Sequence, residues 1–275
     1  MKWNRRNTLS SSLYLLWMII FVIVPLLIMA WYGFHDDSGH LTWANIIAIA
    51  RPVHRKALFI SIRLSVVCTL ICFVLAVPLS LVLRGLHMNR SGFIVFIFIL
   101  PMWMNFLLRT IAWQSLLEKS GVINQLLKMA HLPTQNMINT EGAIVIGMVY
   151  NYLPFMVLPI YNALSKISQD TFDAAKDLGA GWWYTMKHIT FPLIFPGIVS
   201  GSTMVFVPAL TTFVLSDFLG GGKIQLIGNV IEQEFTTANN WNVGAGLSLV
   251  LMILVILSMA IMSKYDKSGE GAGIW

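Results

Sequence analysis

The sequence predicts an all-α membrane protein with about six transmembrane helices. Hydrophobic residues make up 57% of its 275 residues and charged residues only 11%. The charged share is about half of what water-soluble domains carry. Six stretches of 18 to 29 residues contain no Asp, Glu, Lys or Arg. They lack the polar alternation of barrel strands, so their backbone polar groups must be satisfied within helices.

The stretches follow one another at residues 13–32, 64–83, 91–108, 142–165, 189–216 and 235–263. As a helix, each is long enough to cross a hydrocarbon core about 30 Å thick. Together they fill half of the chain, which leaves no room for a soluble catalytic domain. We therefore expect one transmembrane domain over residues 1–275.

The first stretch needs a separate argument, because a basic start followed by an apolar run also occurs in secretory signals. A signal has an apolar core of about 7–15 residues and a small-residue cleavage site. Here the run has 20 residues, and no such site precedes His35. We interpret residues 13–32 as a retained transmembrane helix.

The middle stretches carry packing signals. Cys68 and Cys72 are one helical turn apart and indicate neither a disulfide framework nor a metal site. Gly197 and Gly201 have the spacing that lets two membrane helices approach closely. Eight of the ten prolines lie in the six stretches. They indicate either the general tolerance of membrane helices for proline or a bundle that bends between states.

The charge pattern predicts the orientation. Six spans place both termini and the second and fourth loops on one side, which carries ten Lys and Arg residues against six on the other. This excess predicts that both termini lie in the cytoplasm, although the cluster Arg51, Arg55 and Lys56 argues for the opposite orientation. The net charge of +6 follows from this bias, and we expect no nucleic-acid partner.

The loop that precedes the fifth stretch contains the most informative pattern. Asp170 is suited to capping a short helix through residues 173–175, and Gly179 is suited to ending it. A second amphipathic segment, residues 182–188, leads into the fifth stretch. A compact, Ala-rich element on a cytoplasmic loop is better explained as a docking surface than as a surface hairpin.

Six residues of this loop have a recognisable spacing. They are Asp173, Ala174, Ala175, Gly179, Ile189 and Pro192. This pattern resembles the coupling motif E-A-A-x3-G-x9-I-x-L-P of the membrane subunits of binding-protein-dependent ABC importers. Asp173 replaces the Glu of the motif and Phe191 its Leu, and both changes keep charge or apolarity. The resemblance implies a type I ABC importer permease whose ATPase-coupling loop spans residues 166–192.

The resemblance extends over residues 57–263 and narrows to the spermidine/putrescine permease branch. The stretches that carry it are residues 107–113, 147–161 and 216–230. Permeases for iron, thiamine and other small solutes are built similarly, so another solute remains the alternative.

The family resemblance also implies the partners. They are a second homologous permease, a cytoplasmic ATPase dimer that binds ATP and Mg, an extracellular polyamine-binding protein and the lipid bilayer of the bacterial cytoplasmic membrane. The chain itself lacks the phosphate-binding G-x-x-x-x-G-K-[ST] pattern. We expect a non-catalytic transport subunit with no cofactor and no metal of its own.

A polyamine pathway calls for carboxylates and aromatic faces, because charge pairing and cation–π contacts hold an ammonium chain. The candidates are Asp217, Trp103, Tyr150, Tyr152, Phe155 and Tyr161. A solvated helix end is the alternative for Asp217, and an interfacial or core position is the alternative for each aromatic residue. Arg109 argues against a cationic solute unless it faces away or is paired.

Two other classes of transport protein were weighed. A secondary transporter typically has ionisable residues at the membrane midplane, and the six stretches contain none. A channel calls for a repeated pore-lining element, which the sequence does not show. Dependence of transport on ATP separates these classes from an ABC importer.

Overall fold

The structure is a computed structural model, and it describes residues 14–85 and 102–264. The secondary structure of these residues is helical, apart from one isolated bridge between His35 and Leu41. Within the described ranges, five helices are long and apolar enough to cross a membrane: Tyr14–Phe34, Pro52–Gly85, Glu141–Ser165, Trp182–Thr211 and Trp241–Ser263. The predicted all-α membrane fold is confirmed. Both chain ends and most of the third predicted stretch, residues 91–101, lie outside the described residues.

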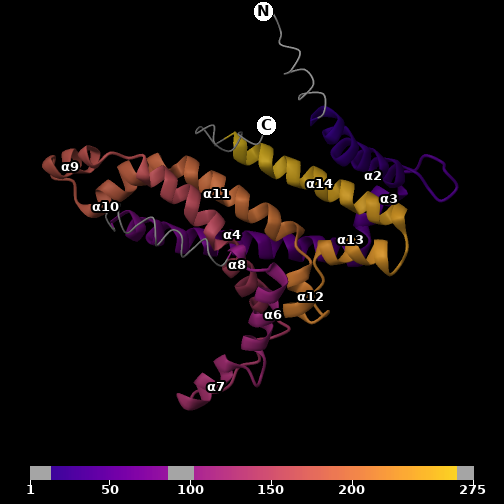
Figure 1. The fold of residues 1–275 in the computed structure, drawn as a ribbon, viewed down its shortest axis with the longest axis horizontal. Helices are drawn as coiled ribbons and strands as arrows, with labels where there is room; N and C mark the ends of the chain where they lie inside the picture. Colours follow the sequence, from indigo (N-terminus) through magenta and orange to yellow (C-terminus); the bar gives the residue numbers. More distant parts are fainter. Residues whose placement is uncertain (1–13, 86–101, 265–275) are drawn as a thin grey trace, which may run out of the picture. The chain divides into compact units, whose positions relative to one another are not determined.

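The described residues, whose helices are labelled in Figure 1, divide into two compact units by their contacts. The first contains residues 14–56 and 230–254, and the second contains residues 57–85, 102–229 and 255–264. A single transmembrane domain over the whole chain stays a prediction.

The first unit is built on closely approaching backbones. Its elements are η1 (Ile19–Ile23), α2 (Val24–Phe34), α3 (Ala44–Ile47), η2 (Ala48–Ala50), the first residues of α4 (Pro52–Gly85) and the larger parts of α13 (Ile227–Thr236) and α14 (Trp241–Ser263). A Cβ atom at Gly33 would lie 2.5 Å from Leu249 Cδ1, and one at Gly246 would lie 2.6 Å from the backbone oxygen of Asn45. Glycine is therefore required where α14 meets α2 and α3.

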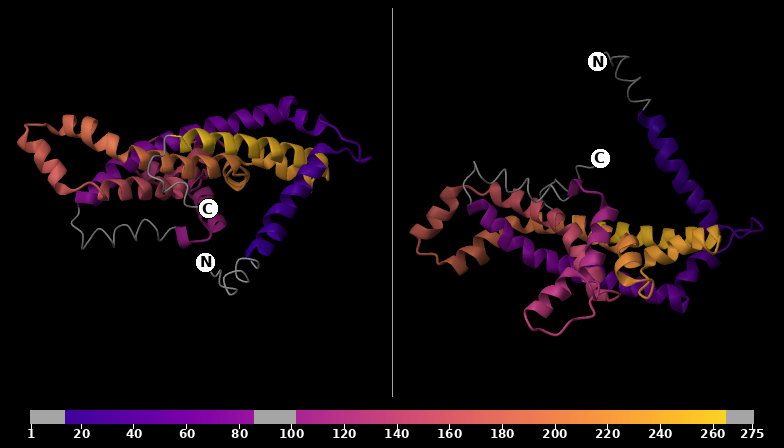
Figure 2. Two further views of the ribbon diagram at one scale, coloured as in Figure 1. Left: turned by 90° about the horizontal axis from the view of Figure 1, so that it is seen from above. Right: turned by 60° about the horizontal axis from the view of Figure 1, so that its bottom comes forward.

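The second unit holds the other elements. They are most of α4 (Pro52–Gly85), α6 (Phe106–Leu117), α7 (Val122–Met129), α8 (Glu141–Ser165), α9 (Gln169–Asp177), α10 (Trp182–Thr185), η3 (Met186–Thr190), α11 (Phe191–Thr211), α12 (Val214–Gly220), the start of α13 (Ile227–Thr236) and the end of α14. Helices α8 and α11 pack along their length, and the views in Figure 2 show α9 and α10 beyond the ends of this pair.

Small residues bring α8 and α11 together. A Cβ atom at Gly197 would lie 2.6 Å from the Pro159 backbone oxygen, and one at Gly201 would lie 2.8 Å from Met156 Sδ. The Gly-x-x-x-Gly spacing thus serves helix packing, as the sequence predicts.

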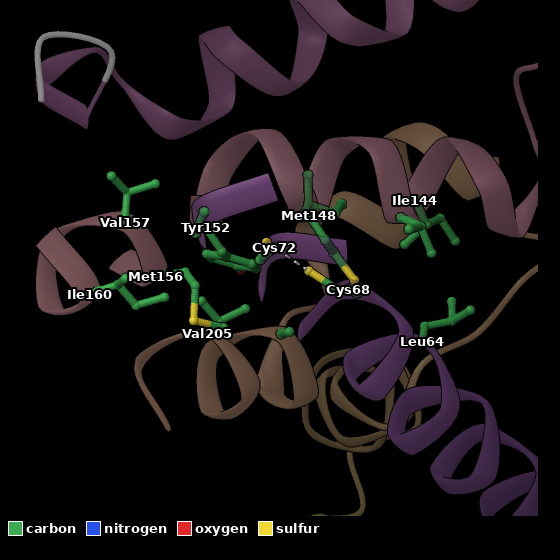
Figure 3. Packing of buried hydrophobic residues seen from close by; sticks show 14 of the residues in the cluster. Leu64, Cys68, Cys72, Ile144, Met148, Tyr152, Met156, Val157, Ile160 and Val205 are labelled. Atoms are coloured by element: carbon green, nitrogen blue, oxygen red, sulfur yellow. Dashed lines mark hydrogen bonds between the residues drawn. The ribbon is translucent and has the colours of Figure 1, made fainter. Parts of the chain in front are cut away.

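The core of the second unit gathers around α8, with residues of α4, α11 and α12 packed against it (Figure 3). Leu64, Cys68 and Cys72 recur every four residues on α4, so one face of this helix is buried. Cys72 lies beside α8, with its Sγ 4.0 Å from the backbone oxygen of Val149. Both cysteines are free thiols, with their sulfur atoms 4.0 Å apart.

The last two predicted stretches differ from the observed helices. Helix α11 ends at Thr211, because Thr212 is extended with ψ 145°, and α12 begins at Val214. Helix α14 begins at Trp241, six residues after the charge-free stretch that starts at residue 235. Absence of charge marks apolar chain but not helix ends, so the fifth predicted helix extended five residues too far and the sixth began six residues too early.

Candidate functional site

The hairpin of α9 and α10 forms the candidate coupling site. Helix α9 begins at Gln169, with Ser168 as its N-cap residue in extended conformation. The predicted cap, Asp170, is instead in the first turn of the helix, where a carboxylate interacts favourably with the helix dipole. The cap prediction was wrong by two residues, because Ser168 and Asp170 are both good capping residues and only the backbone geometry separates them.

Gly179 ends α9 as predicted. It adopts φ +77°, a left-handed conformation that suits glycine. Its N–H donates to the oxygen of Lys176 over 2.9 Å, and the N–H of Ala180 donates to the oxygen of Ala175 over 2.9 Å. These two bonds define a Schellman motif, which fixes the direction in which the chain leaves the helix.

Beyond this turn the chain runs as one continuous helix from Trp182 to Thr211. The motif residues Ile189 and Pro192 lie inside it, where the π-helical turn η3 precedes α11. Proline lacks an N–H and its ring crowds the carbonyl four residues earlier, which explains a widened turn at this place. The second part of the coupling loop is thus an extension of the membrane helix.

The hairpin exposes a large apolar surface. Leu178 is 89% exposed and Trp183 is 78% exposed, and Trp182 and Tyr184 are also exposed. Of the motif residues on α9, Asp173 and Ala174 are exposed, whereas Ala175 is buried. A groove of about 390 Å³ lies beside the turn. It is lined by Ala175, Leu178, Gly179, Ala180, Gly181, Tyr184 and Ile189.

The predicted aromatic pathway residues are spread over different levels and faces of the second unit. Trp103 is 73% exposed, whereas Tyr152 is buried and donates from its hydroxyl to the Pro208 oxygen over 3.4 Å. Tyr150 packs edge-on against Trp113, with ring centroids 5.2 Å apart. Two further candidates are half-buried against the core, Phe155 and Tyr161. None of the four cavities found among the described residues is lined by these rings.

Asp217 is held beside the break between α11 and α12. Its Oδ1 accepts a hydrogen bond from Asn229 Nδ2 over 2.6 Å, and the same nitrogen donates to the Phe213 oxygen over 3.1 Å. A Cβ atom at Gly228 would lie 2.8 Å from the Thr211 oxygen. The Gly228-Asn229 pair thus packs against the break. No sequence pattern predicts this role for the two residues, although they lie within residues 216–230, which carry the family resemblance.

Two buried polar atoms of the second unit have no hydrogen-bond partner within the described residues, Arg109 Nε and Asn151 Oδ1. Arg109 is 8% exposed, and its guanidinium carbon lies 6.0 Å from the centroid of the Phe106 ring. Neither ion pair found among the described residues includes Arg109. The ion pairs of the described residues therefore do not supply the pairing of Arg109 that a cationic solute calls for.

The first unit contains a cavity that the sequence analysis missed. Its volume is about 470 Å³, and it is lined by Trp31, Tyr32, His35, Asp36, Asp37, Gly39, Asn239, Trp241 and Asn242. Asp37 Oδ1 accepts from Asn242 Nδ2 over 2.7 Å, and the rings of Tyr32 and Trp241 lie 6.2 Å apart. The sequence signal for this cavity was the pair Asp36 and Asp37, which follows a helix end rich in aromatic residues. The approach of this pair to Trp241 depends on tertiary structure and could not be predicted from the pattern.

Comparison with known proteins decides the family. The model of the family "Binding-protein-dependent transport system inner membrane component" matches residues 59–268. The chain belongs to this family. It is therefore a non-catalytic permease subunit of an ABC importer and a multi-pass protein of the inner membrane, and the ATPase is a separate subunit. Among the described residues, no group of three or more His, Cys, Asp or Glu side chains is placed to hold a metal ion.

Several curated relatives of this permease cover nearly its whole length. The spermidine/putrescine transport system permease protein PotB of Haemophilus influenzae is 31% identical over 272 residues, which cover 96% of this permease and 95% of the relative. PotB of Escherichia coli is 34% identical over 259 residues, which cover 91% and 94%. The inner membrane ABC transporter permease protein YdcU of Escherichia coli is 29% identical and covers 91% of this permease and 86% of the relative.

A solved structure has the same fold. It is the crystal structure of a bacterial alginate ABC transporter in complex with an alginate pentasaccharide-bound periplasmic protein, and its matching chain has a TM-score of 0.78. The match covers 96% of both chains at 16% sequence identity. The likeness therefore concerns the fold of this permease and not its solute.

Proposed function

We propose that this permease forms the translocation pathway of an ATP-driven importer for polyamines, spermidine or putrescine. The observation that carries the proposal is the identity of 31–34% to PotB relatives over more than nine-tenths of the chain. The cavity in the first unit supports it, because Asp36 and Asp37 supply negative charge beside Trp31, Tyr32 and Trp241. Carboxylates and aromatic faces are the groups that hold a flexible ammonium chain.

In this proposal the α9–α10 hairpin docks in a groove of a cytoplasmic ATPase dimer. Support comes from the exposure of Leu178 and Trp183, since large apolar side chains exposed together mark an interaction surface. The continuous helix from Trp182 to Thr211 would carry a rotation of the hairpin into the membrane. The other partners are a second homologous permease and an extracellular polyamine-binding protein.

The proposed orientation places both termini in the cytoplasm and the cavity of the first unit outside. It rests on the excess of Lys and Arg on the side of the termini. With this orientation the Asp36-Asp37 pair lies on the extracellular side, where the binding protein delivers the solute. The coupling hairpin lies on the cytoplasmic side, where the ATPase binds ATP.

Uptake of radiolabelled spermidine and putrescine tests the proposal. Cells that lack the chain are compared with cells that regain it, with the neighbouring subunits present and the proton gradient collapsed in a parallel sample. Uptake that returns with the chain and persists without the gradient, while ATP is maintained, supports a polyamine importer. If neither polyamine enters, the polyamine assignment fails. Uptake that stops with the gradient instead indicates a secondary transporter.

One observation favours a second candidate, an importer for another small solute that carries less positive charge than a polyamine. Arg109 is buried in the second unit without an ion-pair partner among the described residues. A buried positive charge repels a passing cation strongly when little water screens it. Replacing Arg109 with Gln tests this point: faster polyamine uptake would show that the arginine opposes cations, and unchanged uptake would place it away from the pathway.

A further inference from the structure

The cytoplasmic end of α4 holds the beginning of the coupling hairpin through one side chain. Arg84, in the last turn of α4, donates from a terminal guanidinium nitrogen to the backbone oxygen of Ile167 over 2.8 Å. Its guanidinium carbon also lies 4.1 Å from the centroid of the Phe172 ring. Ile167 lies between α8 and α9, and Phe172 is on α9. Arg84 therefore contacts both the joint and the helix that follows it.

The rest of the joint is loosely packed. A cavity of about 550 Å³ separates it from α11, with Ile167, Thr171 and Gly197 among the residues of its wall. Within α9, all of which the structure describes, Ala175 is the one buried residue. Helix α9 thus has little apolar packing through which its movement could reach the membrane helices. The hydrogen bond and the ring contact of Arg84 are more specific connections than this sparse packing.

Helix α4 is in turn fixed to α8 in the core. Ser80 Oγ donates to the Val157 oxygen over 3.3 Å, and Cys72 lies beside the Val149 oxygen. A displacement of the Arg84 end therefore reaches the packed face of α4 through a rigid helix. Coupling through a contiguous set of contacts and a rigid element is the physical basis for transmission over such a distance.

We propose that Arg84 is a positioning residue that transmits movement of the coupling hairpin to α4, by gripping the Ile167 carbonyl and the Phe172 ring together. Guanidinium suits this task because it is planar, permanently charged and able to stack and donate at once, whereas an ammonium group on lysine is a point charge. The inference rests on the proposed docking of the hairpin to the ATPase.

Two fluorescent labels in the complete transporter separate transmission from docking. Each label is used in a separate variant. One variant carries the label at Lys176→Cys on α9, the other carries it at Val82→Cys on α4, and both positions are exposed. The native Cys68 and Cys72 are fully buried, so a water-soluble maleimide reacts at the introduced cysteine. The measurement is the change in emission on adding ATP and vanadate, which needs no knowledge of the solute.

In the parent chain we expect both labels to respond. In Arg84→Gln and in Phe172→Leu we expect the α9 label to respond as before and the α4 response to fall by roughly fivefold, within the range of coupling changes seen along such networks. Phe172→Tyr keeps the aromatic ring and should give the full α4 response, whereas Arg84→Lys should give only part of it. The double variant Arg84→Gln/Phe172→Leu should lose no more of the α4 response than either single variant, because both substitutions remove the same contact. Lys128→Gln, an exposed cation on α7 and outside the coupling loop, serves as the matched control.

Each contrary result has a distinct meaning. An α4 response that is unchanged in Arg84→Gln overturns the inference and leaves docking intact. Loss of both responses in Arg84→Gln also overturns it, because the arginine then only maintains the hairpin. If the α9 label fails to respond in the parent chain, the proposed docking fails and the inference fails with it.

Discussion

The amide of Asn229 donates to the carboxylate of Asp217 over 2.6 Å and to the Phe213 backbone oxygen over 3.1 Å. One side chain thus joins the candidate pathway carboxylate to the interruption between α11 and α12. A backbone oxygen freed by a helix break inside an apolar bundle must find a donor, and Asn229 supplies one. The position of the Asp217 charge and the geometry of the break therefore depend on each other.

Replacing Asp217 with Asn tests the charge without changing the shape. We expect polyamine uptake to fall by roughly tenfold, because hydrogen bonds to charged groups contribute about 1.5–3 kcal/mol and the amide keeps only part of that. The measurement is uptake rate against polyamine concentration, with Glu118→Gln, an exposed acid elsewhere in the second unit, as the control. If the transporter assembles normally and the uptake kinetics are unchanged, Asp217 only stabilises the break between α11 and α12 and does not contact the solute.

Gly179→Asp is expected to abolish uptake and to release the ATPase while the chain still inserts. At φ +77° a side chain costs about 1–2 kcal/mol, and the added charge lies beside the apolar groove. Co-purification of the ATPase with the permease measures the association. Gly181→Ala is the matched control, because Gly181 has φ −69° and open space around its Cβ position. Normal uptake by the aspartate variant would contradict a docking role for the turn.

Truncating the exposed aromatic side chain of Trp183 to Ala should weaken ATPase binding without unfolding the permease. Buried aromatic anchors at interfaces often contribute 2 kcal/mol or more, so we expect the dissociation constant to rise by roughly tenfold or more. Titration of the ATPase onto the permease in nanodiscs measures the constant. Met129→Ala, which removes a side chain 77% exposed on α7, should leave it unchanged. Equal affinities for both variants would indicate that the tryptophan lies outside the interface.

Gly197→Ala should destabilise the α8–α11 pair by about 1–3 kcal/mol, the usual range for overpacking. The added methyl would lie 2.6 Å from the Pro159 oxygen and 2.8 Å from the Ala163 Cβ, and neither backbone can yield easily. The melting temperature of the purified permease in detergent reports the effect. Gly142→Ala adds a methyl near the start of α8 at an ordinary distance of 3.6 Å from Thr140 Oγ1 and should be neutral or mildly stabilising. A melting temperature unchanged in Gly197→Ala would contradict tight packing at this crossing.

The coupling hairpin was largely predictable, because its features are local. The end of α9 at Gly179 follows from the one residue type that readily adopts positive φ, and the close approach at Gly197 follows from spacing on one helix face. The helix start was less predictable, since Ser168 and Asp170 compete as caps. The sequence pattern showed that residues 182–188 lead into the fifth stretch, but it did not show that both belong to one continuous helix.

The candidate pathway was much less predictable. Tyr150 and Tyr152 are near neighbours in sequence, yet one is partly exposed and the other is buried against Pro208. The grouping of Asp36 and Asp37 with Trp241 joins segments about 200 residues apart, which no local pattern encodes.

By itself, the sequence determined that this chain crosses a membrane in helices and that a short loop helix ends at Gly179, because both depend on the length of apolar runs and on the conformations open to single residues. Only the tertiary structure decided that Arg84 grips the Ile167 carbonyl 83 positions away and that Asn229 holds Asp217. Periodicity fixes which face of a helix is buried, but the neighbour that covers this face is selected by packing of the whole chain.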